Sequence, residues 1–491
     1  MLIFIRNIIL AVSLFISLFL VAFSPVGFLP TVVFSVIFNL ILYFALNNLS
    51  RYPGLSIFSL LVWLGLFLKT TCFVVLGRGL KDPTGLFKGT DLQWHDLFYV
   101  SILGGLAILS AFYFSGMFAQ KSDVPKSDLQ RRGLAPDLKI SHSLLVGFLF
   151  VLLCVTSLNL FFGITLSGLA AVTHLPFKLN AMSGWMLYLG FTLSLSVLLL
   201  LSLRDKKYFN ICLLLVFVEG FLCSVSIISR GLYVFHVLPT VALLIVNRQT
   251  LQISYQKIAG LLVAFVVGLF LTVGTVTQFR QFLFSRYAFD SQSYSISFDN
   301  IFQSNRATLG TDTVFGQTWG VLSDLFVSRW VGAEGLMSTV SYEDKSLGLL
   351  LDSLIRVPKA GEQDIFAKIS GFAYAENSKI SFAFIPGPFA LFYYSGNLFV
   401  VFAGIFGLCL FLFVWDEFVW RLFKNPFLSY QIAVYLGVNA AQFGLSPLPL
   451  VKALVMTATG LVLLKSVINF EVFPAKVTHL WLSLKYKLSK S

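Results

Sequence analysis

Four arginines stand at or near the ends of hydrophobic segments, where a guanidinium can meet a polar group at a membrane surface. Arg230 lies in the short connection 228–231 between two apolar runs, Arg280 follows the next run, and Arg286 and Arg329 come later. Arginine is always charged, and its rigid fork of donors suits a diphosphate better than the ammonium of lysine does. Several arginines at one membrane face can therefore bind a lipid-linked diphosphate.

Each of these arginines also has a simpler explanation. An arginine at the end of a membrane helix commonly extends to lipid headgroups or pairs with a carboxylate. This alternative stays open for Arg230, Arg280 and Arg329, and it is the preferred one for Arg286. Arg230 is the sharpest candidate, because the connection that carries it is too short for the side chain to move far from the membrane.

Two carboxylates flank Arg329 at equal spacing. Glu334 lies five residues after it and Asp324 five residues before it. A carboxylate can serve as the general base that takes the proton of a sugar hydroxyl. A solvated helix face or a helix-stabilising pair explains Asp324 better, and it stays open for Glu334. Trp319 and Trp330 can stack on sugar rings, although aromatic residues at a membrane boundary are more often anchors.

Three ionisable residues, Lys69, Glu219 and His236, lie inside apolar runs. A charge in a membrane span is costly, so an ionisable residue there is a candidate functional residue. These groups could form a proton path in a transporter. A buried polar pair or an interface position explains each of them equally well. His236 follows Arg230 by six residues, so we keep it as a candidate acid or base.

The composition requires lipid as the surrounding medium. The 491 residues are 57% hydrophobic and 12% charged, which no ordinary soluble domain matches. A membrane span needs roughly 20 mainly apolar residues. The apolar runs are continuous and lack the alternation of barrel strands, so we predict an all-α, polytopic membrane helix bundle.

About twelve spans and one long loop make up this predicted bundle. The spans are residues 7–23, 30–46, 55–76, 97–118, 143–162, 185–203, 210–228, 232–246, 258–276, 383–415, 426–443 and 451–470. The tenth run begins with a Pro-Gly-Pro sequence, so we expect its helix to start near Phe392. The predicted units are helices one to nine in 1–276, a large loop in 277–391, and the last three helices with a basic tail in 392–491.

The distribution of charge predicts the orientation and argues against nucleic acid as a partner. The segments assigned to the inner side carry 18 Lys/Arg and 7 Asp/Glu, whereas 277–381 carries 9 and 11. This asymmetry is the positive-inside pattern, with both termini cytoplasmic and the long loop on the outer side of the membrane. Pro25 disfavours cleavage after Ala22-Phe23-Ser24, so we expect residues 7–23 to be a retained signal anchor.

The long loop is predicted to contain helices at 313–340 and 347–356, whose apolar faces pack down onto the bundle. All five cysteines fall in predicted spans. The loop therefore has neither a disulfide nor a cysteine-based metal site. Walker, HExxH, CxxC-pair and GxSxG motifs are absent, so function must come from scattered residues.

The order of features resembles the Wzy-type polymerases of bacterial surface polysaccharides. The resemblance lies in Ile228-Ser229-Arg230-Gly231 before an apolar helix, in Arg280 after the next outward span, and in the long outer loop that follows. Within the loop it continues through 327–340, 350–358 and 385–396. It covers roughly 210–413, while the first half of the chain contributes helix number and topology alone.

This resemblance implies a metal-independent glycosyltransferase that polymerises undecaprenyl-diphosphate-linked oligosaccharide repeat units at the periplasmic face of a bacterial inner membrane. The resemblance implies no cofactor. The partners that it implies are the lipid-linked oligosaccharides and membrane lipid, with a chain-length regulator protein as a further candidate. Arg230 and Arg280 are then expected to bind substrate, and Arg329 and Glu334 to be catalytic, with Glu334 the weaker candidate for the base.

Three alternatives stay open. An O-antigen ligase has the same layout and donor but transfers glycan to lipid A core. A flippase for lipid-linked oligosaccharides has about twelve helices too, yet it needs no long outer loop. A secondary transporter would show charged groups or broken helices in matching halves, and no such symmetry is visible.

The predicted topology is tested by cysteine labelling in intact cells. Single cysteines at Asp299 and Glu362 should react with an impermeant reagent added outside, and cysteines at Arg131 and Lys487 should react only after the cells are opened. Labelling of the long loop from the cytoplasm would contradict the orientation and, with it, the placement of the arginines.

Overall fold

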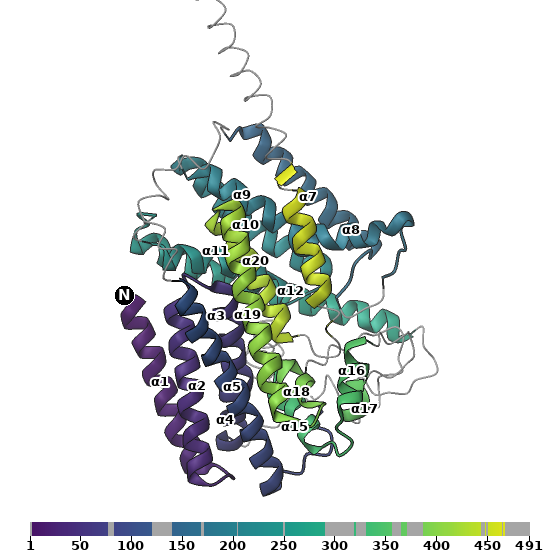
Figure 1. Cartoon of the computed structure of the whole chain (residues 1–491). Coiled ribbons are helices and arrows are strands. Elements are labelled where there is room, and N and C mark those ends of the chain that lie inside the picture. Colours follow the sequence, from purple (N-terminus) through teal and green to yellow (C-terminus); the bar gives the residue numbers. More distant parts are fainter. Residues whose placement is uncertain are drawn as a thin grey trace, which may run out of the picture.

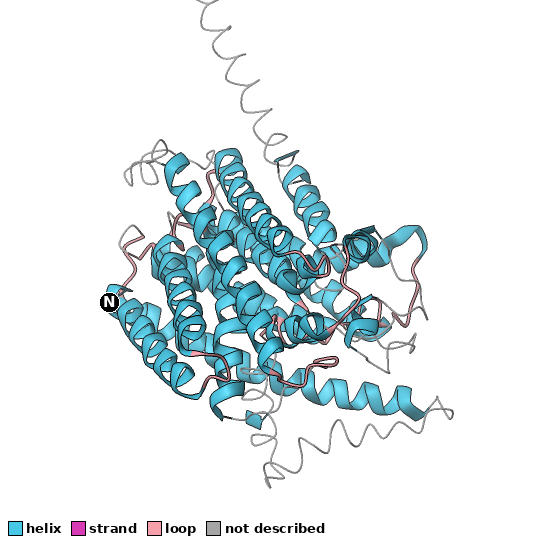
Figure 2. Ribbon diagram, turned by 60° about the horizontal axis from the view of Figure 1, so that its bottom comes forward, coloured by secondary structure: helices cyan, strands magenta, loops and turns pink. Residues whose placement is uncertain are grey.

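The computed structural model describes residues 2–76, 83–119, 140–167, 171–203, 205–248, 251–289, 319–320, 330–355, 365–370, 386–442, 447, 450–463 and 465–466. Throughout these residues the regular elements are helices, with no strand (Figure 2). The predicted all-α class is therefore confirmed for the described part of the chain.

The helices follow one another along the chain in three groups. The first holds α1 (Leu2–Phe23), α2 (Phe28–Asn48), α3 (Pro53–Val62) continued by η1 (Trp63–Leu68) and α4 (Lys69–Leu76), and α5 (Asp91–Ala119). The second holds α7 (His142–Phe162), η2 (Pro176–Lys178), α8 (Leu179–Trp185) continued by η3 (Met186–Gly190) and α9 (Phe191–Ser202), α10 (Lys206–Ile227), α11 (Leu232–Val246) and α12 (Tyr255–Phe289). The third holds α15 (Ala333–Ser341), α16 (Leu347–Ile355), α17 (Ile365–Ser370), α18 (Gly387–Tyr393), α19 (Leu398–Phe423) and α20 (Pro426–Gln442), and a further helix covers Leu450–Leu463.

Eleven of the twelve predicted spans overlap one of these helices or helical runs, the last of them only as far as the described residues reach, and the tenth falls on two helices, α18 and α19. Within the described residues, nine are long and apolar enough to cross a membrane. The helices Leu232–Val246 and Leu450–Leu463 are apolar but shorter, and α20 has 17 residues. The chain is thus a multi-pass helical membrane protein.

The predicted start of the tenth span near Phe392 is wrong. Residues Gly387–Tyr393 form a separate short helix, α18, and the long helix α19 begins at Leu398. Gly396 has a φ of 68°, which interrupts the helix. Asn397 then caps α19, because its side-chain oxygen accepts a hydrogen bond from the Phe399 N–H at 2.8 Å.

Two hydrophobic clusters meet along α20. Leu428, Ile432 and Leu436 pack with α1 to α5 and α19, whereas Phe427 and Tyr430 pack with α7 and α9 to α12. Figure 1 shows α1 to α5 (purple to blue) and α7 to α10 on different sides of the molecule, with α19 and α20 (green) alongside both. The seam along α20 therefore joins the two halves of the bundle.

A buried carboxylate ties α19 to the beginning of α3. Asp416 is 9% exposed, and its Oδ2 accepts a hydrogen bond from the Gly54 N–H at 2.8 Å. The first N–H groups of a helix lack partners within the helix, and a carboxylate satisfies them. A Cβ at Gly54 would lie 2.7 Å from the Asp416 carboxylate, so the contact requires glycine there.

Part of the long loop packs onto the bundle, as predicted. All nine residues of α15 are buried, and α15 contacts α5, α17 and α18. Figure 1 shows α15 to α18 gathered at one end of the bundle, beside α19. The helix predicted at 347–356 is confirmed as α16 (Leu347–Ile355). The helix α12 runs to Phe289, past the predicted start of the loop at residue 277.

Candidate functional site

Three of the four predicted site residues lie among the described residues, and they fall in two parts of the structure. Arg230 and Arg280 come together at one end of the bundle, and Glu334 lies elsewhere, on α15. Arg329 lies outside the described residues, and the side chain of Arg286 does too.

A tight turn presents Arg230 between α10 and α11. The helix α10 ends at Ile227, and Ile228 takes a left-handed conformation with a φ of 62°. The Ser229 N–H then donates to the Ser224 carbonyl at 2.9 Å, which closes the end of α10. Arg230 is partly exposed and α11 starts at Leu232. The turn thus holds Arg230 at the helix end, as the short connection predicted.

Arg280 reaches the same turn from the end of another apolar helix. Its Nε donates to the Ile228 carbonyl at 3.0 Å, and its Nη2 donates to the Ser167 carbonyl at 3.2 Å. The Ser167 N–H in turn donates to the Ile227 carbonyl at 2.8 Å. Two connections of the bundle therefore converge on the guanidinium of Arg280, and its partner Ile228 stands two residues before Arg230. We call Ser167, the turn 228–231 and Arg280 the arginine site.

A buried asparagine fixes the geometry of the arginine site. Asn159 on α7 is fully buried, and its Nδ2 donates to the Ser226 carbonyl at 2.8 Å and to the Thr165 carbonyl at 3.1 Å. Its Oδ1 accepts from the Thr165 N–H at 2.8 Å. One amide thus joins the end of α7 to the end of α10. A polar residue inside an apolar run was the only signal in the sequence for this contact.

The arginine site can attract and orient an anion. Two guanidinium groups lie at one end of the bundle, and both are partly exposed. Backbone carbonyls fix the orientation of Arg280, so little side-chain freedom remains to be lost when a ligand binds. The part of α12 that is apolar enough to cross a membrane, Tyr255–Arg280, ends in this site and exposes Val263, Val266 and Val267. A ligand with a lipid tail can therefore lie along α12 while its anionic head meets Arg280.

Glu334 is buried in an ion pair with Lys69. Lys69 Nζ lies 2.5 Å from Glu334 Oε1, and both side chains are under 5% exposed. Lys69 Nζ also donates to the Trp330 carbonyl at 2.9 Å. The pair connects α4 to the start of α15. It explains why two charges stand in otherwise apolar surroundings, since each neutralises the other.

Close backbone contacts add to this attachment of α15. A Cβ at Gly65 would overlap the Val331 carbonyl oxygen, and a Cβ at Gly335 would overlap Pro386. At the other end of α15, Lys345 Nζ donates to the Val340 carbonyl at 3.0 Å, as cations at helix C-termini often do. Burial lowers the pKa of Lys345, and the nearby charges of Asp96 and Glu343 oppose this effect.

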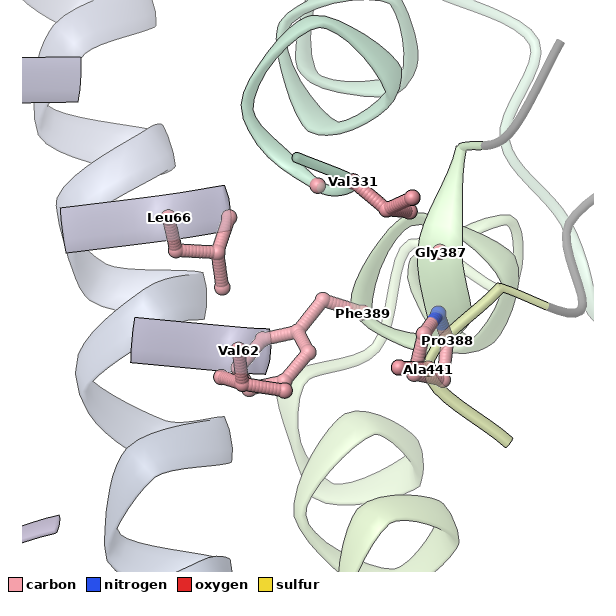
Figure 3. Close-up of a pocket in the computed structure, with 8 residues that line it drawn as sticks. Val62, Leu66, Val331, Gly387, Pro388, Phe389 and Ala441 are labelled. Atoms are coloured by element: carbon pink, nitrogen blue, oxygen red, sulfur yellow. The ribbon is translucent and has the colours of Figure 1, made fainter. Parts of the chain in front are cut away.

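An apolar pocket lies between η1, α18 and the residues before α15. Figure 3 shows Val62, Leu66, Val331 and Phe389 around it. The remaining lining residues are Gly332, Gly387, Pro388 and Ala441. No side chain in this lining is charged, so the pocket does not suit a diphosphate or a sugar.

Glu219 and His236, the other two ionisable residues inside the predicted spans, form a second buried pair. His236 Nδ1 lies 2.8 Å from Glu219 Oε1, with exposures of 2% and 0%. Lys69, Glu219 and His236 are thus members of buried polar pairs, one of the explanations that the sequence left open. The sequence could not supply the partners, because Lys69 and Glu334 are 265 positions apart.

Comparison with protein-family models, with curated proteins and with solved structures finds no match.

Breaking the Lys69–Glu334 pair should loosen α15. Glu334→Gln or Lys69→Met alone leaves one buried charge without its counterpart and should cost about 3–5 kcal/mol of stability. The double variant removes both charges and should recover much of this loss. Thermal unfolding in detergent and limited proteolysis would measure it. Losses that simply add in the double variant would show that the two side chains are not coupled.

Proposed function

We propose that the chain is a glycosyltransferase that polymerises undecaprenyl-diphosphate-linked oligosaccharide repeat units at the periplasmic face of a bacterial inner membrane. The growing glycan leaves its diphosphate carrier and joins a hydroxyl of the incoming repeat. The sequence pattern from 210 to 413 suggested this reaction. The arginine site is the structural observation that supports it.

The argument for this function rests on where Arg230 and Arg280 meet. The two residues are fifty positions apart, and Arg280 nevertheless donates to the carbonyl of Ile228, two residues before Arg230. Both guanidinium groups lie at the end of helices that can cross a membrane. A diphosphate attached to a polyprenyl chain needs this combination of paired cations and adjacent lipid-facing surface.

The proposed chemistry follows from the leaving group. The bond between the sugar carbon and the diphosphate oxygen breaks, and a bond from that carbon to the acceptor oxygen forms. The departing diphosphate gains negative charge, which fixed guanidinium groups stabilise without reorganising during the reaction. The acceptor hydroxyl passes its proton to a base. Arg230 and Arg280 therefore act on the donor.

The Lys69–Glu334 pair makes a positioning role for Glu334 a better explanation than the role of general base. A carboxylate that is 3% exposed and bound to an ammonium group does not face an incoming hydroxyl. Its position at the first turn of α15 favours a positioning role, in which the pair holds the outer segment on the bundle. Arg329 directly precedes Trp330, whose carbonyl accepts a hydrogen bond from Lys69. It remains our candidate for a contact to the sugar or the diphosphate.

Substitution of Arg230 tests the assignment. Arg230→Lys keeps the charge but loses the fork, and Arg230→Ala loses both, so glycan chain length should decrease in that order. Loss of one contact to a developing charge typically lowers the rate on the order of a hundredfold. Surface glycan resolved on gels, with protein levels measured in parallel, gives the readout.

Arg421→Ala is the matched control. Arg421 also lies near a helix end, but it is paired with Glu417 by a 2.7 Å contact at the predicted cytoplasmic side. This variant should retain normal chain length. Single repeats on the acceptor in Arg230→Ala cells support a polymerase, whereas loss of all surface glycan supports a flippase or a ligase. Normal chains at normal protein level would remove Arg230 from the site.

A further inference from the structure

Three side chains of metal-binding types meet in the interior, away from the arginine site. Glu219 and Cys223 lie four positions apart on α10, so they share one face of that helix, and His236 faces them from α11. Their ligand atoms all lie within 4.8 Å of one another. The three residues are at most 2% exposed.

The imidazole is oriented as in a metal site. His236 Nε2 lies 3.2 Å from the Tyr188 carbonyl oxygen, which can only accept a hydrogen bond. Nε2 therefore carries the hydrogen, and the lone pair of Nδ1 points toward Glu219 and Cys223. A second hydrogen bond of this kind, from the outer ring nitrogen to a carbonyl, is the usual way in which proteins fix a metal-binding histidine.

The polar atoms of this cluster are incompletely satisfied within the described part of the chain. Nδ1 and Glu219 Oε1 are 2.8 Å apart, yet Nδ1 has no hydrogen-bond partner among the described residues. Glu219 Oε2 has no hydrogen-bond partner there either. Buried polar atoms are rarely left in this state. Glu219 Oε1 accepts a hydrogen bond from the Cys223 thiol at 3.5 Å. An ion among these atoms would take the place of the thiol hydrogen and would also satisfy Nδ1 and Oε2.

Charge balance indicates a divalent ion. A thiolate, a carboxylate and a neutral imidazole carry two negative charges together, so a dication makes the filled site neutral. Neutrality matters because an uncompensated charge in the interior of a membrane bundle is costly. Sulfur, imidazole nitrogen and carboxylate oxygen are the ligands that zinc takes in tetrahedral sites. With both oxygens of Glu219, the cluster offers four donor atoms.

We propose that Glu219, Cys223 and His236 bind a zinc ion that joins α10 to α11. Gly220 allows the approach: a Cβ there would lie 2.7 Å from Val237 and 3.5 Å from the Cβ of His236. The site holds together the two helices whose connection carries Arg230. Its role is to stabilise that turn, and it takes no part in the transfer of sugar.

Elemental analysis of the purified protein tests the site. The wild-type chain should contain about one zinc ion per molecule, because a fully buried ion is retained through purification. Cys223→Ala and His236→Ala should each lose most of it. Cys212→Ala removes another buried cysteine of α10, outside the cluster, and should retain the zinc.

Cobalt substitution detects metal binding in the wild-type protein itself, so the test does not depend on whether the variants fold. Protein produced in zinc-depleted medium with cobalt should show the near-ultraviolet absorption of a cobalt–thiolate bond. Cys212→Ala should keep this band and Cys223→Ala should lose it. Wild-type protein that contains neither zinc nor cobalt, or Cys223→Ala protein with its full zinc content, would overturn the proposal.

Discussion

The structure depends on one constraint, which is that charged and polar groups inside a lipid-embedded bundle must find partners in the protein. Lipid offers no hydrogen bonds, and an isolated charge is costly there. The chain meets this constraint by placing such residues from different helices side by side: Lys69 on α4 with Glu334 on α15, Glu219 on α10 with His236 on α11, and Asp416 on α19 with the start of α3. These few contacts fix which helices are neighbours, whereas apolar packing alone would permit many arrangements.

The same constraint explains how the functional surface is built. Because Glu334 can be buried only beside Lys69, the irregular segment before α15 is held against η1, and α15 cannot stand off as a separate domain. At the arginine site, backbone carbonyls of two connections accept the guanidinium of Arg280. The result is a rigid, cationic end of the bundle beside lipid-facing helices. That arrangement supports the proposed transfer of glycan from a lipid diphosphate.

Much of the fold could be predicted because a span is a local feature of the sequence. Among the described residues, apolar runs of sufficient length indicated the long helices, with an error at the start of α19, and the short connection at 228–231 indicated where Arg230 would stand. The helix α18 was missed, because Pro386-Gly387-Pro388 looks like a loop, although proline is well tolerated in the first turn of a helix. The pairing of Glu334 with Lys69 could not be predicted, since nothing local marks a partner on a distant helix. The carboxylate that resembled a base is therefore better explained as a positioning group.

The most direct test of the proposed function uses purified protein in lipid vesicles with undecaprenyl-diphosphate-linked repeats as the only substrate. The account predicts products that lengthen by whole repeats, with one undecaprenyl diphosphate released for each bond formed. A variant with Ala at both Arg230 and Arg280 should bind the lipid-linked repeats more weakly and form no ladder. Vesicles in which the repeats cross the bilayer but never lengthen, or lengthening that persists in the double variant, would contradict the account.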